Sequence, residues 1–446
     1  MGGSPEAVIG IDLGTSGCRG VAVDGSGAIL AEARRLLPRP LTPAEGWVEQ
    51  DPELWWEAVR RLLGEVAAEF SGVNAGTKAR TKISALCVDG TSGTLLLADR
   101  NGRPLTAALL YNDRRALEAA TAVDNLGPPD SAARGPTSSL SKLIHLAHGL
   151  SGGGTLPAET LALHQADWIT GRLTGRYGRS DWNNALKLGY DAARLVWPDW
   201  VLGLIPKGVR LPLVLAPRAD VGRLAPGLAA ELGLDPGARV LAGTTDSTAA
   251  VIAAGAHWPG DAVTCLGSTL VLKIVSERPL TASRYGIYSH RLGDLWLVGG
   301  ASNSGGAVLR QFFSDAELVA LSARIDPERP SGLDYYPLPR PGERFPRADP
   351  QLPPRIAPVP EDPVRLLHGL LEGMARIEVE GYALLARLGA PRPTRVLTTG
   401  GGAVNPTWES IRRRALGVPV TAATHQEAAY GAALLALEGA NTRVPG

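Results

Sequence analysis

The sequence lacks the features that mark several classes of protein. Lys and Arg total 45 against 44 Asp and Glu in 446 residues, so no excess charge points to nucleic acid or to a membrane surface. Only three cysteines occur, Cys18, Cys87 and Cys265, each inside an apolar stretch and without Cys-x-x-Cys spacing. This sparse set argues against a disulfide framework or a zinc site, and it is typical of a reducing compartment.

Long apolar runs and metal-binding patterns are also missing. Apolar stretches such as Ala249–Ala256 are far too short to span a bilayer, and Met1–Pro5 does not begin a secretion signal. The seven histidines show no spacing that suits a metal ion. We therefore expect a cytoplasmic monomer or homodimer that binds neither nucleic acid nor membrane.

What the sequence does contain is a glycine hairpin that carries a carboxylate. Val8–Asp24 reads as two apolar strands around a turn, with Asp12 at the end of the first strand and Gly14, Thr15 and Ser16 in the turn. Small turn residues let backbone N–H groups face an anion, and the hydroxyls add donors. The hairpin therefore suits a phosphate group, although an ordinary β-hairpin is the alternative.

A second glycine hairpin follows in the second half of the chain. Asp261–Ile274 again places a turn of small residues, Gly267, Ser268 and Thr269, between two β-like runs. One such hairpin in each half indicates phosphates held between two related domains. The length of 446 residues is sufficient for two or three domains.

Hydrophobic periodicity predicts alternating strands and helices in the first half. Asp51 and Pro52 start a helix as N-cap and first-turn proline, Ile83–Val88 is a buried strand, and Leu161–Thr170 is a further helix. Pro206–Pro236 contains five prolines and has weak periodicity, which predicts an inter-domain region.

The second half continues this alternation. Val240–Gly243 is a predicted strand that leads through a hydroxyl-rich turn into the small-residue helix Ala249–Ala256. Asp326–Asp362 is rich in Pro and Arg and is expected to be a surface loop with little regular structure. Further helices are predicted at Asp362–Leu388 and Pro406–Leu416.

Four glycine- or hydroxyl-rich turns thus follow strands, at 14–17, 243–248, 267–269 and 400–402. Together with longer motifs, they make the chain similar to the FGGY carbohydrate kinases of the actin-like ATPase superfamily. The stretches that carry this resemblance cover most of the chain: IGIDLGTSGCRGVAVD (9–24), GWVEQDPELWW (46–56), VDGTSGTLLLAD (88–99), YNDRR (111–115), SDWNNALKLGYD (180–191), AGTTDSTAAVIAAGA (242–256), CLGSTLVLKI (265–274), GGASNSGGAVLRQFF (299–313), TGGGAVNPTWESIRRRALGVPV (399–420) and EAAYGAALLA (427–436).

The resemblance implies a fold and its cofactors. We expect an α/β protein of two RNase H-like (actin-like ATPase) domains, each with a five-stranded mixed sheet and helices on both sides, and an interdomain cleft. Residues 1–236 would form the N-terminal sugar-binding domain, and residues 237–446 the C-terminal nucleotide-binding domain. ATP and Mg²⁺ are the implied cofactors, with a small-molecule sugar as the phosphoryl acceptor.

The resemblance also implies the reacting groups. Asp246 matches the family's catalytic base, which takes the proton of a sugar hydroxyl as the phosphoryl group arrives; a helix cap is the alternative. Asp12 matches the carboxylate that helps to hold Mg²⁺, and Asp246 is the second candidate metal ligand. Asp12, Ser92 and Asp246 are expected to contact the sugar.

Contacts to the nucleotide are implied for the glycine turns. Glycines let the backbone approach the phosphates and the adenosine, the turn hydroxyls donate hydrogen bonds, and an asparagine can hydrogen-bond the adenosine. The expected ATP-binding residues are Gly14, Thr15, Ser16, Gly267, Ser268, Thr269, Asn303, Gly401 and Asn405.

Sugar specificity depends on the turn Val88–Thr94. Bacterial xylulokinases of the family usually carry a Gln-Met-His-Gly type of turn here and glycerol kinases an Asn-Gln-Arg-Glu type, whereas this chain reads VDGTSGT. The turn resembles the compact plant and cyanobacterial branch once labelled xylulose kinase-like, which implies D-ribulose as substrate. D-xylulose, a pentitol or another sugar is the alternative within the family. A catalytically idle, nucleotide-gated regulatory protein is the alternative from another class, which loss of Asp12 or Asp246 would favour.

Two charged motifs have a structural interpretation beside a functional one. Asp113 and Arg114 either border the sugar pocket or form a surface salt bridge. The run Arg412–Arg414 is expected on the solvated face of a helix.

Overall fold

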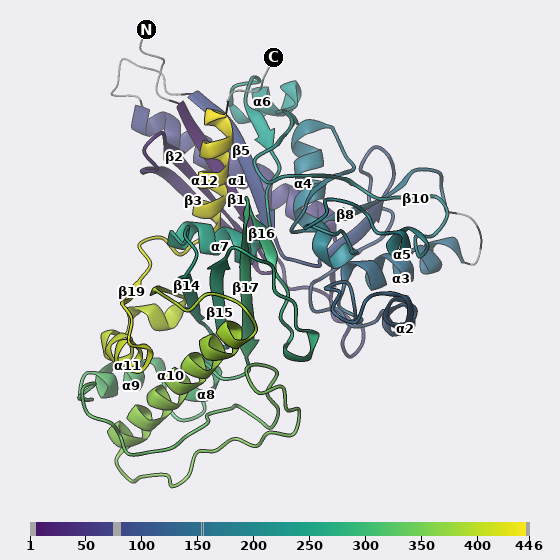
Figure 1. Ribbon diagram of the computed structural model, residues 1–446. Coiled ribbons are helices and arrows are strands. Elements are labelled where there is room, and N and C mark those ends of the chain that lie inside the picture. Colours follow the sequence, from purple (N-terminus) through teal and green to yellow (C-terminus); the bar gives the residue numbers. More distant parts are fainter. Residues whose placement is uncertain (1–5, 75–81, 153, 155, 443–446) are drawn as a thin grey trace. The chain divides into compact units, whose positions relative to one another are not determined.

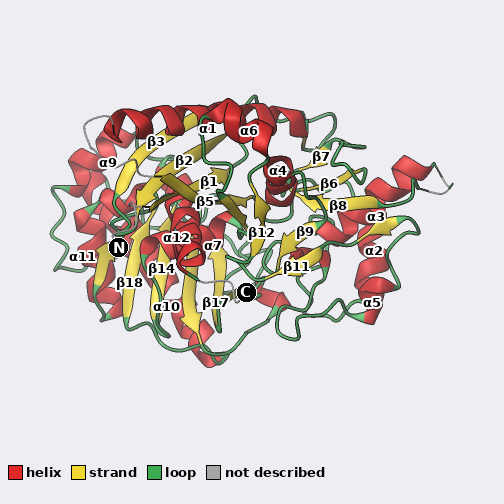
Figure 2. Cartoon of the chain, turned by 90° about the horizontal axis from the view of Figure 1, so that it is seen from above, coloured by secondary structure: helices red, strands yellow, loops and turns green. Residues whose placement is uncertain are grey.

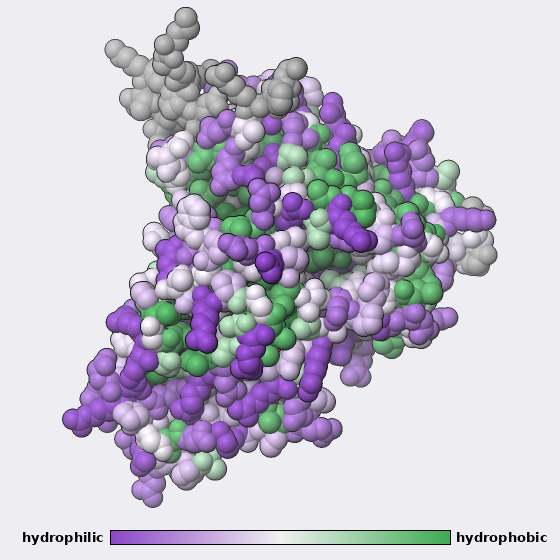
Figure 3. Space-filling model, in the orientation of Figure 1, coloured by the Kyte–Doolittle hydropathy of each residue, from purple (hydrophilic) through white to green (hydrophobic). Residues whose placement is uncertain are grey.

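The computed structural model describes residues 6–74, 82–152, 154 and 156–442, which divide into two compact units (Figure 1). Unit 1 comprises the chain up to Ala253 together with the chain from Glu427 onward, and unit 2 comprises Ala254–Gln426. Met1–Pro5 lies outside the described residues. Among the described residues, no helix combines the length and the apolar character needed to cross a membrane. Hydrophilic and hydrophobic side chains are interspersed over the face drawn in Figure 3.

Unit 1 is built around a six-stranded mixed sheet of order β12-β13-β5-β1-β2-β3. Its strands are β1 (Glu6–Leu13), β2 (Gly17–Asp24), β3 (Ile29–Leu36), β5 (Lys82–Gly90), β12 (Asp220–Arg223) and β13 (Arg239–Leu241). β1, β2 and β3 form an antiparallel meander, whereas β5 runs parallel to β1, and β13 runs parallel to β5. The carboxyl ends of β1, β5 and β13 therefore lie at one edge of the sheet.

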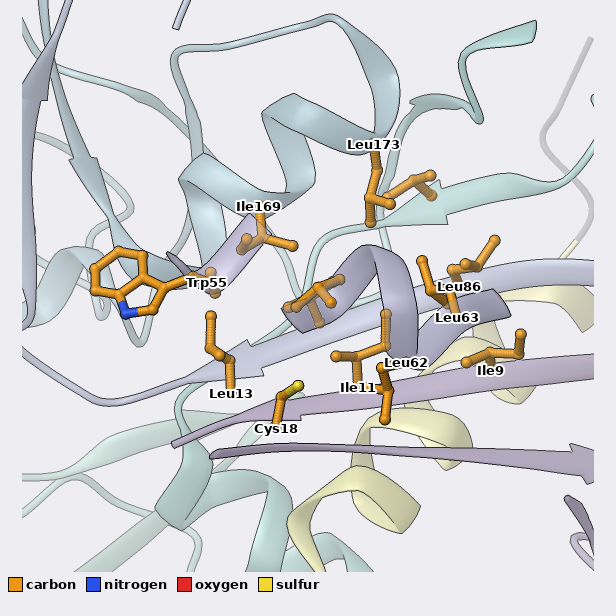
Figure 4. Packing of buried hydrophobic residues seen from close by; sticks show 14 of the residues in the cluster. Ile9, Ile11, Leu13, Cys18, Trp55, Leu62, Leu63, Leu86, Ile169 and Leu173 are labelled. Carbon is orange, nitrogen blue, oxygen red and sulfur yellow. The ribbon is translucent and has the colours of Figure 1, made fainter. Parts of the chain in front are cut away.

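Helices cover both faces of this sheet. Figure 2 shows α1 (Pro52–Asn74) on one face and α12 (Ala428–Asn441) on the other. Ile9, Ile11 and Leu13 alternate along β1 and pack in one buried cluster with apolar side chains of α1 (Figure 4). The alternation follows from the two-residue period of a strand, which also directs the intervening residues to the α12 face.

The α12 face of β1 is in very close contact with the helix. A Cβ on Gly10 would lie 2.0 Å from the carbonyl oxygen of Ala429, so only glycine fits. A Cβ on Gly431 would lie 1.9 Å from the carbonyl oxygen of Ala249, in α7 (Asp246–Ala254). The small residues of the last helix therefore let it join unit 1.

A second sheet of five strands, ordered β10-β8-β6-β7-β4, and a β11-β9 pair complete the strands of unit 1. The elements not yet given are β4 (Glu49–Gln50), β6 (Leu95–Ala98), β7 (Ala108–Leu109), α2 (Leu117–Leu126), α3 (Ser139–Ser151), β8 (Thr160–His164), α4 (Gln165–Thr174), β9 (Arg179–Asp181), η1 (Ala185–Leu188), α5 (Asp199–Leu202), β10 (Val209–Arg210), β11 (Leu213–Leu215) and α6 (Pro226–Leu232).

Unit 2 contains a six-stranded mixed sheet of order β16-β17-β15-β14-β18-β19. Its elements are β14 (Asp261–Leu266), β15 (Leu270–Ser276), η2 (Ser283–Tyr285), β16 (His290–Leu292), β17 (Leu295–Ser302), α8 (Gly306–Leu309), α9 (Asp315–Ser322), α10 (Pro363–Arg387), β18 (Arg395–Thr399), η3 (Gly401–Val404), α11 (Pro406–Leu416) and β19 (Val420–Ala422). β14, β15 and β17 form an antiparallel meander, with β18 parallel to β14 and β19 parallel to β18.

The two units share one sheet pattern. The order β3-β2-β1-β5-β13 of unit 1 has the same strand directions as β17-β15-β14-β18-β19 of unit 2. This repetition agrees with the expected class of two RNase H-like α/β domains. Each sheet has six strands and not the expected five, because β12 pairs with β13 in unit 1 and β16 pairs with β17 in unit 2.

Three expectations about the layout of the chain are wrong. Leu161–Thr170 is not one helix, because the buried residues of β8 pair with β6 before α4 begins at Gln165. Pro206–Pro236 is not an inter-domain region, because it forms β10, β11, β12 and α6 inside unit 1. The division between units also falls after Ala253 and not after residue 236, since β13 pairs with β5 and α12 returns to β1.

The predicted helix Asp362–Leu388 corresponds to α10, with Asp362 as its N-cap, and Figure 1 shows α10 as the long helix of unit 2. The segment before it, 326–362, forms no helix or named strand, as expected, yet it is not merely a surface loop. Tyr335, Tyr336 and Phe345 are buried in the core of unit 2.

A buried ion pair joins α11 to α10, where the sequence predicted a solvated arginine face. The Arg412 side chain is 1% exposed, and its guanidinium donates to both carboxylate oxygens of Glu378 at 2.6 and 2.7 Å. Arg412 also donates to Thr398 Oγ1 at 2.7 Å, and Thr264 Oγ1 donates to Glu378 at 2.6 Å. Helical spacing turns Arg412 toward β18, while the next two arginines of the run stay exposed.

Replacing Glu378 by Ala should lower the free energy of unfolding by about 3–5 kcal/mol, because the Arg412 guanidinium would stay buried without its carboxylate. Denaturant unfolding of the purified chain measures this loss. The matched control is Glu409→Ala, which removes an i,i+4 pair with the exposed Arg413 and should cost less than about 1 kcal/mol. Equal losses in the two variants would contradict the structural role given to Glu378.

Candidate active site

Three carboxyl groups meet at one edge of the unit 1 sheet. Asp12 near the end of β1 pairs in register with Asp89 near the end of β5. Thr245 forms a bridge with Gly90, the last residue of β5, and Asp246 follows as the first residue of α7. Because the carboxyl ends of parallel strands share an edge, the three carboxyl groups lie where ligands collect in α/β sheets.

The chain reaches this edge through a close approach at Gly243. A Cβ there would lie 1.8 Å from the carbonyl oxygen of Val88, so only glycine lets the segment pass beside β5. Asp246 then opens α7, and its Oδ1 accepts a hydrogen bond from Ser247 N at 2.6 Å. The unpaired N–H groups and the dipole at a helix N-terminus favour an ionised carboxylate.

Burial and like charge raise the pKa of two of these carboxyls. Burial raises the pKa of the half-buried Asp12, against the opposing effects of the neighbouring Asp89 carboxyl group and of the Arg19 charge. Burial, followed by the charges of Asp12 and Asp246, raises the pKa of the fully buried Asp89 well above its usual value. The surroundings of Asp89 therefore disfavour a negative charge on its carboxyl group.

Several buried polar atoms in unit 1 have no hydrogen-bond partner among the described residues. They include both carboxyl oxygens of Asp89, Ser92 Oγ, Gln165 Nε2 and Asn184 Oδ1. Gln165 adjoins the Ser92 turn, since its Oε1 accepts from Thr91 N at 3.0 Å and from Thr91 Oγ1 at 2.8 Å. Each unpaired atom costs about 1–3 kcal/mol, which a ligand rich in hydroxyl groups could recover.

Asp181 organises the SDWNN segment beside the same edge. Its Oδ1 accepts from Asn183 N at 2.8 Å and from Asn184 N at 3.1 Å, and its Oδ2 accepts from Asn184 Nδ2 at 2.6 Å. Asn183 Nδ2 donates to Thr244 Oγ1 at 2.9 Å, and Thr244 lies two residues before Asp246. Burial, helped by the charge of Asp167, raises the pKa of Asp181 to about 7.

The first glycine hairpin lies on this unit next to the carboxyl groups. Gly14 N donates to Gly17 O at 2.9 Å and closes the turn between β1 and β2. Thr15 is half-buried and Ser16 is exposed, so both hydroxyls are accessible to a ligand. The expected phosphate contacts of Gly14, Thr15 and Ser16 stay predictions.

Unit 2 gathers its own glycine turns at one edge of its sheet. Gly306 N donates to Gly267 O at 2.9 Å, and Ala307 N donates to Ser268 O at 3.1 Å, so the turns after β14 and β17 pack together. Parallel pairing of β14 with β18 brings the turn 400–402 beside 267–269. A Cβ on Gly401 would meet nothing within 4 Å, which leaves its backbone open to a ligand.

The two asparagines expected at the nucleotide are engaged within unit 2. Asn405 is the N-cap of α11: its Oδ1 accepts from Trp408 N at 3.0 Å, and its Nδ2 donates to Ser322 Oγ at 2.9 Å. Asn303 Nδ2 donates to Gly342 O at 3.0 Å. These bonds hold the turns in place, and contacts of the two asparagines with a nucleotide stay predictions.

Reasoning from the sequence missed Asp89 and Gln165. Asp89 had a readable signal, because it ends a buried strand before a glycine as Asp12 does. Gln165 was hidden by the prediction of a single helix over 161–170, where the strand actually ends at His164. Among the described residues, no group of three or more His, Cys, Asp and Glu side chains is arranged to hold a metal by itself.

Comparison with known proteins gives a consistent result. Residues 7–253 match the N-terminal domain, and residues 262–440 the C-terminal domain, of the FGGY family of carbohydrate kinases. The chain is 26% identical to the xylulose kinase of Escherichia coli (strain K12) over 97% of this chain and 90% of the relative. It is 28% identical to the xylulose kinase of Streptomyces coelicolor over 93% of this chain and 83% of that relative. The solved xylulose kinase from Rhodospirillum rubrum has the same fold, with a TM-score of 0.83 at 24% identity over 98% of this chain and 91% of that chain.

The raised pKa of Asp181 predicts a pH-dependent stability. Between its ordinary value of 3.8 and about 7, the folded chain holds a proton that the unfolded chain has lost, so stability should fall as the pH rises through this window. Asp181→Asn removes the titrating group and should flatten this part of the curve. Thermal unfolding of both chains from pH 4 to pH 8 measures the difference, and parallel curves would refute the assignment.

Proposed function

This chain belongs to the FGGY family of carbohydrate kinases, and we propose that it transfers the γ-phosphoryl group of ATP to the terminal hydroxyl of a ketopentose. The observation that supports this most strongly is the cluster of Asp12, Asp89 and Asp246 beside buried polar atoms that have no partner in the described segments. Such a site offers a base, negative charge for a cation, and unpaired hydrogen-bonding groups for a polyhydroxylated substrate.

Asp246 is the proposed general base. Its carboxylate takes the proton of the ketopentose O5 hydroxyl, the O5 oxygen forms a bond to the γ-phosphorus, and the bond from that phosphorus to the ADP oxygen breaks. Asp89 is the weaker candidate for this role, because burial and the charges of Asp12 and Asp246 disfavour its ionised form.

Mg²⁺ is proposed as the cation that accompanies ATP. Magnesium is usually held by one or two carboxylates together with phosphate oxygens, so a cage of three protein ligands is not required. Asp12 and Asp246 would hold it, since both carboxyl groups lie at the same edge of the unit 1 sheet. When bound, the ion neutralises charge on the phosphates.

ATP itself is proposed to be held by the glycine turns. In unit 1 these are the N–H groups and hydroxyls of the hairpin 14–16. In unit 2 the turn 267–269 and the open backbone of Gly401 take this role, with Asn303 and Asn405 supporting the turns. Each set supplies donors for anionic oxygens without a bulky side chain in the way.

D-ribulose is the proposed substrate, on the strength of the turn Asp89–Thr94. Its short side chains leave Ser92 Oγ buried and, among the described residues, without a partner, so this oxygen is available to bond a sugar hydroxyl. D-xylulose is the alternative, which the names of the similar kinases favour. The idle regulatory alternative is weakened because Asp12 and Asp246 are both present. A cytoplasmic location and a monomeric or homodimeric state stay predictions.

Asp246→Ala should lower kcat about 10²-fold or more, because the base is removed together with one of the two proposed Mg²⁺ ligands. The KM for ATP should stay largely unchanged, because Asp12 and the glycine turns remain. A coupled ADP-release assay with ketopentose measures both constants. Asp199→Ala, at the exposed start of α5, is the matched control and should behave as the parent chain. A near-normal kcat in Asp246→Ala would rule out this residue as the base.

D-ribulose should exceed D-xylulose in kcat/KM by about 10-fold to 100-fold, since the two differ only at C3 and one or two contacts distinguish them. Glycerol should be a poor substrate. Ser92→Ala should raise the KM for the ketopentose more than the KM for ATP. A panel of ketopentoses, pentitols and glycerol tests this, and a higher kcat/KM for D-xylulose or glycerol would overturn the substrate while leaving the kinase proposal intact.

A further inference from the structure

A fully buried lysine lies behind the turn that carries Ser92. Lys142 on α3 is 0% exposed, and its Nζ donates to Gly93 O at 2.8 Å and to Leu110 O at 2.6 Å. No ion pair joins it to a carboxylate in the described part of the chain. Burying an ammonium without a carboxylate is costly, so an apolar side chain would pack this helix more favourably.

The Ser92 turn is held by lysines from two elements. Lys187 of η1 donates to Ser92 O at 3.5 Å, while Lys142 of α3 donates to the next carbonyl, Gly93 O. Gly93 has a φ of +90°, and a Cβ there would lie 3.3 Å from Lys187 Cδ. With two successive carbonyls bound, the orientation of the Ser92 backbone, and with it the hydroxyl, is restricted.

The second carbonyl that Lys142 binds, Leu110 O, belongs to a buried hydrogen-bond network. Leu110 O also accepts from Asp113 N at 2.9 Å, and Asp113 Oδ2 accepts from Val48 N at 2.6 Å. The Asp113 carboxylate is fully buried against Arg115 at 2.8 Å, so it does not form a surface salt bridge, and its place at the border of the sugar pocket stays a prediction. Lys142 thereby connects the Ser92 turn to a rigid part of unit 1.

We propose that Lys142 is a positioning residue for the sugar, whose ammonium holds the Ser92–Gly93 turn so that the Ser92 hydroxyl meets the substrate. This inference rests on the proposed function of the same site. It predicts an effect on sugar binding and not on ATP binding, because the ammonium of Lys142 bonds the carbonyl oxygens of Gly93 and Leu110.

The surroundings of Lys142 make this support sensitive to pH. Burial, followed by the like charge of Lys187, lowers the pKa of Lys142 to about 7, with Asp113 opposing and Arg115 adding to the effect. β6 presents only apolar residues to α3. Further titratable groups on the packed helices are His145 of α3 and the exposed Glu118 of α2. Above about pH 7 the neutral amine makes weaker bonds than the ammonium, so the turn should be held less firmly.

The experiment compares the parent chain with Lys142→Met, which keeps the shape, and Lys142→Gln, which keeps N–H donors but does not titrate. Lys82→Met, at an exposed ion pair with Asp235, is the control. KM for sugar, KM for ATP and kcat are measured from pH 6 to pH 9. Lys142→Met should raise the KM for sugar about 10-fold with the KM for ATP within about twofold, and Lys142→Gln should recover part of the loss.

The parent should show kcat/KM for sugar falling above about pH 7, and both Lys142 variants should lack this fall. Equal changes in the two KM values, or an unaltered pH profile in folded variants, would overturn the proposal. If the variants do not fold, the affinity of the parent chain for the sugar is measured by calorimetry instead. An affinity that is constant from pH 6 to pH 8.5 would refute the proposal. The substrate panel is run first, so a parent that uses a different sugar refutes D-ribulose and the Lys142 test proceeds with that sugar.

Discussion

Parallel hydrogen bonding between β1 and β5, and between β5 and β13, brings three strand ends to one edge of the unit 1 sheet. Everything at the candidate site depends on this pairing. It sets Asp12 opposite Asp89 and delivers Asp246 at the start of α7, although the first and last of these residues are far apart in the chain. The pairing requires glycine at 243, because any larger residue would collide with the carbonyl oxygen of Val88.

This arrangement costs free energy in two ways, through repulsion between carboxyl groups and through the burial of polar atoms. Three ionised carboxyl groups at one edge would repel one another, and burial together with the charges of Asp12 and Asp246 raises the pKa of Asp89 well above its usual value. Within the part of the chain that the structure describes, Ser92, Gln165 and Asn184 each keep a buried polar atom without a partner. A core built only for stability would avoid such groups, whereas a site for a cation and a polyol uses them.

In unit 2, two buried charges of opposite sign form an ion pair. Arg412 and Glu378 bond each other twice and also bond Thr398 and Thr264, so the polar groups of this pair are well satisfied. Its glycine turns gather at the edge where β14 and β18 end, and Gly401 leaves open backbone there. The same sheet pattern thus carries a carboxyl cluster in unit 1 and a set of neutral turns in unit 2.

Local signals in the sequence were sufficient for much of the fold. The caps and periodicity of α1, α10 and α11, the two glycine hairpins, and the motifs of the FGGY kinases are all readable along the chain, because each depends on neighbouring residues. The family motifs also supplied Asp12, Ser92 and Asp246. These were available from the sequence because short motifs place a residue type at a strand end or in a turn.

Contacts between distant segments were decided only by the tertiary structure. The apolar run of β8 predicts a helix, yet hydrogen bonding with β6 makes it a strand. The segment from β12 to α6 was expected to be an inter-domain region, yet it belongs to unit 1. Arg412 resembles a surface residue until Glu378 meets it from another helix. Asp89 became part of the site through its register with Asp12, and Lys142 through two carbonyls from remote loops. Burial and partner identity depend on packing between segments, which local residue patterns do not encode.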